Sequence, residues 1–328
     1  MIEIKNLVKR FGDKLVLSNV SFTVGDNEIV GFLGPNGAGK STTLNIVTGY
    51  LSATEGTAVI EGCDILEDPQ NARAHIGFLP EIPPLYPDMT VAEYLSFIYD
   101  LKGTTLNREK HLEEIAEVTR IADVGQRLIG NLSKGYKQRV GIAQALVGNP
   151  KVIILDEPTV GLDPRQIIEI RNLVRMLGRD HTVIFSSHIL SEVQAVSDRI
   201  VIINKGQIVA DEKTEEISRV VDGRRRFNFT ICGPRNEIYE EIKRIPGVSY
   251  VEAMAGHEPD STQFAVESQT DVRKAVFSVL AANDWPLIGV ETMGVNLEEI
   301  FISLVDRPDG KQPGRRITVP KANQKAGE

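Results

Sequence analysis

The stretch GPNGAGKST, Gly34 to Thr42, follows the apolar run Ile29–Leu33 and precedes a short apolar segment. It contains a glycine, four variable residues and then Gly-Lys-Ser, which is the spacing of a phosphate-binding loop. Glycines let the backbone curl so that its N–H groups point inward, where a side chain would block a phosphate. The stretch therefore predicts a loop that binds a nucleotide between a strand and a helix.

The residues of this loop have separate expected tasks. We expect Lys40 to reach the β and γ phosphates, Ser41 to bind Mg²⁺ and Thr42 to add a hydroxyl donor. The helix expected to begin near Lys40 adds the positive end of its dipole. A glycine-rich turn without a ligand is the alternative, but the order strand, loop, helix argues against it. The expected nucleotide contacts in the loop are Gly34, Pro35, Asn36, Gly37, Ala38, Gly39, Lys40, Ser41 and Thr42.

Two further apolar strands deliver polar side chains at their ends. VIILDEPT, residues 152–159, ends in Asp156 and Glu157, and His188 follows the apolar run TVIF. We interpret Asp156 as the carboxylate on the Mg²⁺ side and Glu157 as the general base for an attacking water. His188 is expected at the same sheet edge, where it would donate to the γ-phosphate or to that water. Solvated strand ends and a surface histidine are the alternatives.

Composition sets the limits on the kind of protein. The chain has 328 residues, which suggests about two domains. Its formal net charge is −8, so a basic nucleic-acid-binding face is not expected. Cys63 and Cys232 have no metal-ligand spacing and are interpreted as small apolar fillers in a reducing cytoplasm. The sequence has no signal peptide and no run of about 18 apolar residues, so another chain would have to hold it at a membrane.

Strand and helix patterns alternate over the first 220 residues. The fully apolar strands suit a parallel sheet covered on both faces. Between residues 88 and 148 the strand patterns give way to helical ones, with helices expected at Tyr94–Leu101, at Lys110–Ile121 and after Ser133. The expected strands are Ile2–Leu7, Leu17–Val24, Ile29–Leu33, Thr57–Ile60, Ile76–Leu79, Val152–Leu155, Thr182–Ser186, Ile200–Ile203 and Gln207–Ala210.

The pattern changes after residue 220. Residues 226–305 have the order β-α-β-β-α-β, which predicts a small ferredoxin-like α+β domain. A closing amphipathic helix is expected over residues 297–305. Residues 306–328 are rich in Pro, Gly, Lys and Arg and lack periodicity, so they are predicted to be a disordered basic tail.

The stretch NLSKGYKQRV, from Asn131, can hold a second phosphate-binding element. Ser133 is placed to cap a helix whose first residues, Lys134 and Gly135, leave N–H groups free. This helix lies in the insert, away from the phosphate loop, so the phosphate it would bind belongs to a second copy of the chain. An ordinary capped helix is the alternative.

Together these motifs resemble the ATP-binding cassette (ABC) transporter ATPases over residues 1–220. They match in order the family's Walker A loop GPNGAGKST, signature LSKGY, Walker B strand VIILDE, D-loop VGLDP and switch histidine His188. The resemblance implies an α/β P-loop cassette with a RecA-like core, an antiparallel β subdomain and the helical insert. It also implies a head-to-tail dimer around two ATP-Mg²⁺, with Ser133 and Gly135 contacting the partner's γ-phosphate. The resemblance further implies that Phe11 takes the adenine-stacking position and that Asp163 couples the two sites.

Two motifs depart from the family pattern. The signature is usually LSGGQ, so Lys134 and Tyr136 replace a glycine and a glutamine, while the serine and the second glycine remain. Glu81, in GFLPE, stands where the family has a glutamine that touches Mg²⁺ and the membrane subunit. The expected metal ligands are therefore Ser41, Asp156 and Glu81, and Glu81 also counts among the nucleotide contacts.

These departures are similar to the ABC-2-type exporter branch, which includes subunits associated with gliding motility and with drug or sodium export. The resemblance implies an ATPase that drives a separate ABC-2-type permease from the inner face of the cell membrane. The resemblance also implies a homodimer or a pseudo-dimer with a paralogue, and no nucleic-acid partner is expected. A soluble ABC ATPase of translation or DNA repair is the alternative. It is disfavoured because the chain has one cassette, no sustained heptads and no cysteine cluster.

Overall fold

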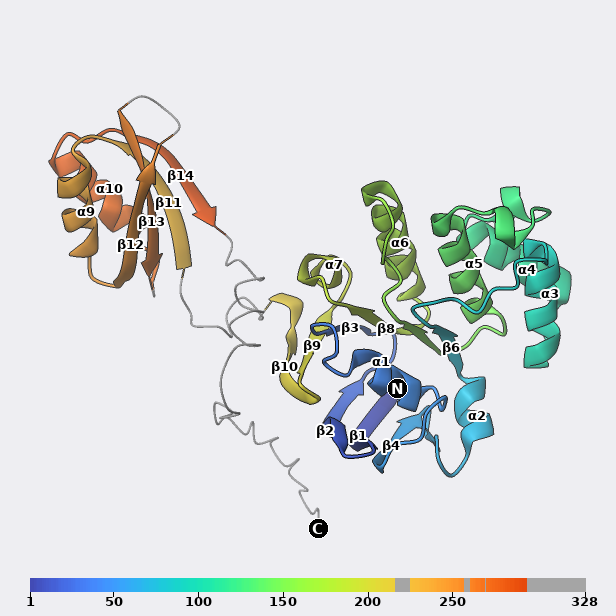
Figure 1. Ribbon diagram of the computed structural model, residues 1–328. Coiled ribbons are helices and arrows are strands. Elements are labelled where there is room, and N and C mark those ends of the chain that lie inside the picture. Colours follow the sequence, from blue (N-terminus) through green and yellow to red (C-terminus); the bar gives the residue numbers. More distant parts are fainter. Residues whose placement is uncertain (216–224, 257–259, 269, 294–328) are drawn as a thin grey trace, which may run out of the picture.

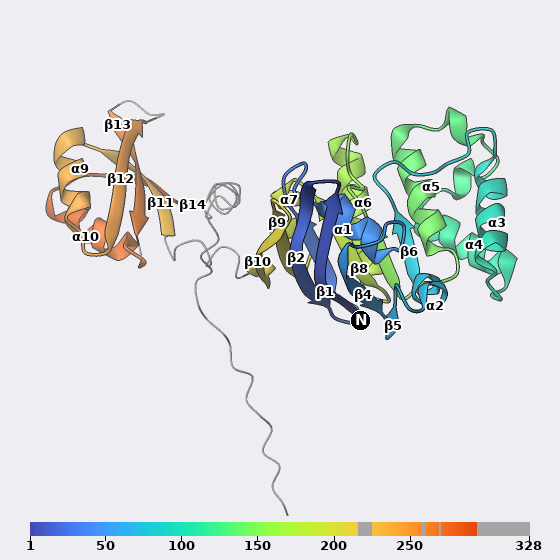
Figure 2. The ribbon, with the colours of Figure 1, turned by 60° about the horizontal axis from the view of Figure 1, so that its bottom comes forward.

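The computed structural model describes residues 1–215, 225–256, 260–268 and 270–293. In this part of the chain the strands form three sheets, of six, four and four strands. Figures 1 and 2 show the six-stranded sheet with helices and a four-stranded sheet around it, and the second four-stranded sheet with its own two helices. The closing helix and the basic tail predicted after residue 293 lie outside the described residues.

The six-stranded sheet places the ends of five parallel strands at one edge. Its strand order is β10-β9-β3-β8-β7-β6, and every neighbouring pair is parallel except β9 and β10. All residues of β3 and β7 are buried, as their uniformly apolar sequences require. The strands are β3 (Ile29–Leu33), β6 (Ile76–Leu79), β7 (Val152–Leu155), β8 (Thr182–Ser187), β9 (Arg199–Asn204) and β10 (Gln207–Lys213).

An antiparallel sheet of order β2-β1-β4-β5 packs against the first through a shared core. That core joins Ile2 and Leu17 of this sheet to Phe32 and Ile154 of the six-stranded sheet and to Leu44 of α1. The elements are β1 (Ile2–Phe11), β2 (Lys14–Val24), β4 (Glu55–Ile60), β5 (Cys63–Asp64), α1 (Lys40–Val47) and the short α2 (Pro69–Ala74).

The chain between β6 and β7 is helical, as predicted. A capping box begins α3, because Thr90 accepts from the Glu93 N–H and Glu93 accepts from the Thr90 N–H. The helix predicted over Lys110–Ile121 ends earlier, at Val118, and Arg120 has a positive φ of 55° that no helix continues through. The helices between β6 and β7 are α3 (Val91–Lys102), α4 (Arg108–Val118), η1 (Ala122–Val124), η2 (Ile129–Asn131) and α5 (Lys134–Leu146). Helix α6 (Pro164–Leu177) follows β7, and α7 (Leu190–Gln194) follows β8.

A second four-stranded sheet, antiparallel throughout, has the order β12-β13-β11-β14 and packs its apolar face on two helices. Phe229 and Phe264 of the sheet share this core with Ile238 of α9 and Val276 of α10. The elements are β11 (Arg225–Cys232), α9 (Arg235–Lys243), β12 (Val248–Ala255), β13 (Ser261–Ser268), α10 (Arg273–Ala282) and β14 (Leu287–Met293). No helix in the described residues is both long enough and apolar enough to cross a membrane.

Gly77 of β6 lets α5 approach the sheet closely. A Cβ at this position would lie 2.1 Å from the Ala145 carbonyl oxygen, so Gly77→Ala has to push α5 away. We expect this variant to lower the free energy of unfolding by about 1–3 kcal/mol, the usual cost of overpacking. Urea unfolding followed by circular dichroism measures it. Gly125→Ala is the matched control, because its Cβ would meet only the Ala122 oxygen at 3.5 Å. Equal stability of the two variants would contradict the prediction.

Candidate nucleotide-binding site

The predicted phosphate loop lies between β3 and α1, and close packing fixes its path. A Cβ on Gly34 would lie 2.4 Å from the Ile203 carbonyl oxygen, and one on Gly39 would lie 2.6 Å from Leu17 Cδ2. Gly39 also has a φ of 112°, a backbone conformation that residues with a side chain rarely adopt. The loop glycines are therefore required by space and by conformation, and α1 begins at Lys40 as predicted.

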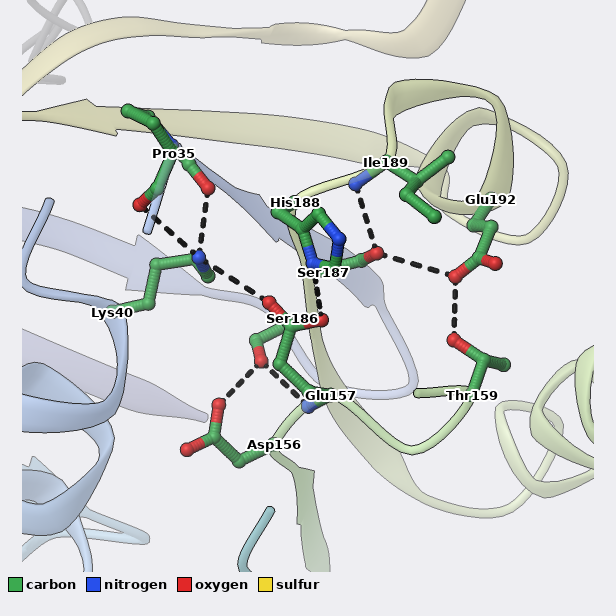
Figure 3. Close-up of polar contacts among 11 residues, drawn as sticks. Pro35, Lys40, Asp156, Glu157, Thr159, Ser186, Ser187, His188, Ile189 and Glu192 are labelled. Carbon is green, nitrogen blue, oxygen red and sulfur yellow. Dashed lines mark hydrogen bonds and ion pairs between the residues drawn. The ribbon is translucent and has the colours of Figure 1, made fainter. Parts of the chain in front are cut away.

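Lys40 is buried and lies between the loop and an acid. Its Nζ donates to the Gly34 carbonyl at 2.7 Å and to the Pro35 carbonyl at 3.3 Å. The same Nζ lies 3.3 Å from Glu157 Oε1, and both side chains are 6% exposed (Figure 3). A charge this far from solvent needs such partners to offset its desolvation.

Ser186 holds the two acids at the end of β7. Its hydroxyl donates to Asp156 Oδ1 at 2.6 Å and accepts from the Glu157 N–H at 2.9 Å. Glu157 has a φ of 49°, in the left-handed region that non-glycine residues seldom enter. The hydrogen bond from its N–H stabilises this conformation, so Ser186 holds the Asp156 carboxylate and the backbone of Glu157.

Glu157 also contacts the predicted switch histidine. His188 Nδ1 lies 2.8 Å from Glu157 Oε2, and because a carboxylate only accepts, Nδ1 carries the proton in this pair. One carboxylate thus joins Lys40 on one side and His188 on the other (Figure 3). These three residues, predicted from three separate motifs, meet in one cluster.

A cavity of about 640 Å³ opens over this cluster, large enough for a nucleotide. Lys14 and Lys205 contribute to its wall and were not singled out in the sequence, because neither belongs to a recognisable motif. Of the three predicted metal ligands, Ser41 and Glu81 line the cavity, whereas Asp156 lies just beneath it, 2% exposed. The lining residues are Lys14, Leu15, Val16, Asn36, Gly37, Gly39, Lys40, Ser41, Thr42, Glu81, Glu157, Val160, His188 and Lys205.

Phe11 is not among these lining residues. It is the last residue of β1, and its side chain is 49% exposed. Lys9 Nζ lies 5.0 Å from its ring centroid, a cation–π contact. The residue predicted to stack on adenine thus stands outside the cavity, next to the strand whose first residues, Lys14 to Val16, do line it.

The signature residues lie in a different place. Ser133 caps α5, as predicted, and accepts from the Tyr136 N–H at 3.4 Å. Ser133 and Gly135 line a second, smaller cavity together with Gln166. Asp163 caps α6, and its Oδ1 accepts from the N–H groups of Arg165 and Gln166, both at 3.0 Å. The structure thus keeps Ser133 and Gly135 out of the cavity that holds their own chain's phosphate loop.

The two unusual signature residues each lie against another segment of the chain. Tyr136 donates its hydroxyl to Asp123 Oδ2 at 2.8 Å, and this hydrogen bond raises the pKa of Tyr136. The Lys134 side chain lies against Gly161 of the D-loop VGLDP. A Cβ placed on Gly161 would be only 2.1 Å from Lys134 Nζ. The glycine at this D-loop position leaves the space that the lysine side chain occupies.

Removing the Ser186 hydroxyl tests its part in the site. Ser186→Ala should lower kcat for ATP hydrolysis on the order of tenfold, because it removes the hydrogen bond to the Asp156 carboxylate and the one that holds the Glu157 N–H. Steady-state phosphate release measures this. Ser278→Ala serves as the control, since Ser278 is an exposed residue of α10 whose hydroxyl donates to the Lys274 carbonyl of the same helix. A kcat equal to that of the unchanged protein would show that Ser186 does not orient the acids.

The glycine loop between a buried parallel strand and a helix, with its lysine beside two acids, defines a P-loop nucleotide-binding protein. A family model described as ABC transporter matches residues 17–160. Linearmycin resistance ATP-binding protein LnrL of Bacillus subtilis (strain 168) is 32% identical, over 94% of this chain and 99% of that protein. Bacitracin transport ATP-binding protein BcrA of Bacillus licheniformis is 30% identical, over 90% of this chain and 99% of that protein.

A solved structure of an ATP-binding cassette has a similar fold. The dimeric post-hydrolysis structure of the ATP-binding cassette MJ0796, bound to ADP and Pi, superposes with a TM-score of 0.60 and 29% identity. It covers 65% of this chain and 99% of that chain. The chain therefore belongs to the ATP-binding subunits of ABC transporters, and it is an ATPase.

Proposed function

We propose that the subunit hydrolyses ATP at Glu157, as a dimer that drives an ABC-2-type export permease. The observation that carries the hydrolytic part is the position of Glu157, between Lys40 and His188 under the phosphate-loop cavity. Glu157 serves as the general base for water attacking the γ-phosphate. Lys40 binds the β and γ phosphates, and His188, held by Glu157 through Nδ1, presents Nε2 to the phosphate.

The site suits Mg²⁺, the usual companion of ATP. Its proposed ligands, Ser41, Asp156 and Glu81, are all oxygen donors, which Mg²⁺ prefers. Among the described residues no three His, Cys, Asp or Glu side chains gather into a metal cage, and Mg²⁺ commonly binds through few protein ligands plus phosphate and water. The ion supplies charge neutralisation at the phosphates, and Ser186 keeps the Asp156 carboxylate directed by its hydrogen bond.

The position of the signature supports a head-to-tail dimer. Ser133 and Gly135 stand at the N-terminus of α5, a 13-residue helix, in their own cavity away from the phosphate loop. A helix N-terminus favours a phosphate, and the one proposed here is the γ-phosphate bound by a second subunit. Asp163 lies nearby at the start of α6 and is proposed to couple the two sites. The MJ0796 cassette, with ADP and Pi, is described as a dimer.

The names of the relatives support export, since one is a resistance protein and one a bacitracin transport protein. The permease is proposed to contact aromatic side chains near Glu81. Tyr86 and Phe97 are 52% and 38% exposed, and their rings meet edge to face at 5.7 Å. Exposed aromatic groups of this kind are typical of protein contacts. The subunit would then lie on the inner face of the cell membrane.

The chain is proposed to contain an ABC ATPase domain at 1–220, with a helical subdomain at about 88–148, and an accessory domain at 226–305. The accessory domain is proposed to be ferredoxin-like. Its elements follow the order β11, α9, β12, β13, α10, β14, and its sheet order β12-β13-β11-β14 places the first and third strands at the centre. Phe11 is proposed to stack on adenine from the rim of the cavity.

A pull-down tests the transporter assignment. A tagged Glu157→Gln variant should retain ATP, hold the closed dimer and copurify with a polytopic membrane protein from detergent-solubilised membranes. The matched control is the same experiment with Lys40→Ala, which should not hold the closed dimer. Recovery of ribosomal or DNA-bound partners, with none of the protein in membranes, would replace this proposal with the soluble ABC ATPase of translation or DNA repair.

A further inference from the structure

A buried carboxylate lies behind the catalytic cluster, on the far side from the phosphate loop. Glu192 of α7 is 3% exposed, although carboxylates are rarely buried without partners. Two buried hydroxyls accompany it, from Thr159, which follows β7, and from Ser187, at the end of β8. Figure 3 shows the three side chains converging from three different segments.

Both hydroxyls bind the same carboxylate oxygen. Thr159 Oγ1 donates to Glu192 Oε2 at 2.5 Å, and Ser187 Oγ donates to it at 3.2 Å. Hydrogen bonds to a charged acceptor are roughly twice as strong as neutral ones. Glu192 therefore ties the loop after β7 to the end of β8.

Each of these two hydrogen bonds lies close in sequence to a residue proposed to act on ATP: Thr159 to Glu157, and Ser187 to His188. Ser187 Oγ also accepts from the Ile189 N–H at 3.0 Å, which closes a tight turn around His188. Thr159 lies two residues after Glu157, and the Glu157 carbonyl accepts from the Val160 N–H at 3.2 Å. Glu192 thus fixes the backbones that carry Glu157 and His188, whose side chains meet at 2.8 Å.

We propose that Glu192 is a positioning residue for hydrolysis: through Thr159 and Ser187 it sets the geometry of the Glu157–His188 pair without touching ATP. This inference rests on the proposed roles of Glu157 and His188. A carboxylate in the first turn of α7 is also favoured by the helix dipole, so a purely structural role is the competing explanation. The two explanations differ in which measured quantity changes.

Three substitutions in the full-length protein separate them. Glu192→Ala removes both hydrogen bonds and should lower kcat by roughly tenfold or more, with the Kd and KM for ATP changed by less than about twofold. Glu192→Gln should keep most of the kcat, because a single amide oxygen can accept from both hydroxyls as Oε2 does. Thr159→Val should lower kcat by itself and should have no further effect when combined with Glu192→Ala.

Thr119→Val is the matched control for the threonine change. Thr119 is buried, as Thr159 is, and its hydroxyl donates to the Ile115 carbonyl in α4. It makes no hydrogen bond to Glu192, Glu157 or Asp156 among those of the described residues. It should leave kcat unchanged. If Glu192→Ala fails to fold, the contrast between Thr159→Val and Thr119→Val still decides the matter.

The inference is overturned if Glu192→Gln is as inactive as Glu192→Ala, if kcat and ATP affinity fall together, or if Thr159→Val matches Thr119→Val. A failure of the proposed function gives a different result. In that case Glu157→Gln would hydrolyse ATP as fast as the unchanged protein, whatever the Glu192 variants do.

Discussion

Replacing Glu157 by glutamine should abolish steady-state ATP hydrolysis while leaving ATP binding intact. The substitution keeps the shape of the side chain and removes its ability to take a proton from water. A positioned general base typically contributes about 10²–10⁴-fold in rate, so kcat should fall by at least about 100-fold. The amide can still accept from His188 Nδ1, which now lies 2.8 Å from Oε2. The variant should therefore bind ATP without turning it over.

Two measurements on the same preparation check this expectation. Phosphate release gives kcat, and equilibrium binding of a fluorescent ATP analogue gives the Kd. Size-exclusion chromatography with ATP and Mg²⁺ should show more dimer for the variant than for the unchanged protein, because the bound ATP persists. Glu241→Gln is the control, since Glu241 lies on α9, pairs with Arg244 and lines neither the nucleotide cavity nor the signature cavity. Undiminished hydrolysis by Glu157→Gln would remove Glu157 from the role of base.

The sequence predicts the site well where a motif is contiguous. A phosphate loop needs its glycines and lysine at fixed positions in the sequence. The start of α1 at Lys40 and the burial of β3 could therefore be predicted from residues 29–47 alone. That Glu157 and His188 lie at the same sheet edge also follows, because both come after parallel strands of one sheet, but their direct contact was not predicted. Ser186 could not be predicted in its role. Its contact with Asp156 depends on β8 lying next to β7, a neighbour relation that spacing does not encode.

Element ends were predicted less well, for local reasons. Strand β1 was expected to stop at Leu7 and continues to Phe11. Register shifts between Leu7, Lys9 and Arg10 break the alternation of inward and outward side chains, so the apolar pattern ends before the strand does. The contacts of Glu192 with Thr159 and Ser187 were not predicted for a different reason. A single glutamate four residues after a histidine belongs to no sequence pattern that indicates a buried side chain.

Replacing Lys40 by alanine should abolish ATP binding, whereas Glu157→Gln should leave it intact. Lys40 is the buried cation of the loop, and its ammonium group is already directed along the loop by the Gly34 and Pro35 carbonyls. Each charge-assisted hydrogen bond to a phosphate is worth about 1.5–3 kcal/mol, so losing two of them weakens binding by roughly 10²-fold or more. Hydrolysis should fall to background as a consequence.

Lys205→Ala is the matched control for this change, because Lys205 lines the same cavity but is exposed and lies outside the phosphate loop. Its Kd for ATP should change by no more than a few-fold, since exposed charges are screened by water and salt. Thermal unfolding of both variants separates lost binding from lost folding, as removing Lys40 takes away the ammonium group that pairs with the buried Glu157 carboxylate. If folded Lys40→Ala bound ATP like the unchanged protein, the cavity would be no phosphate site. A variant that binds without hydrolysing and one that does neither would together assign chemistry to Glu157 and phosphate binding to Lys40.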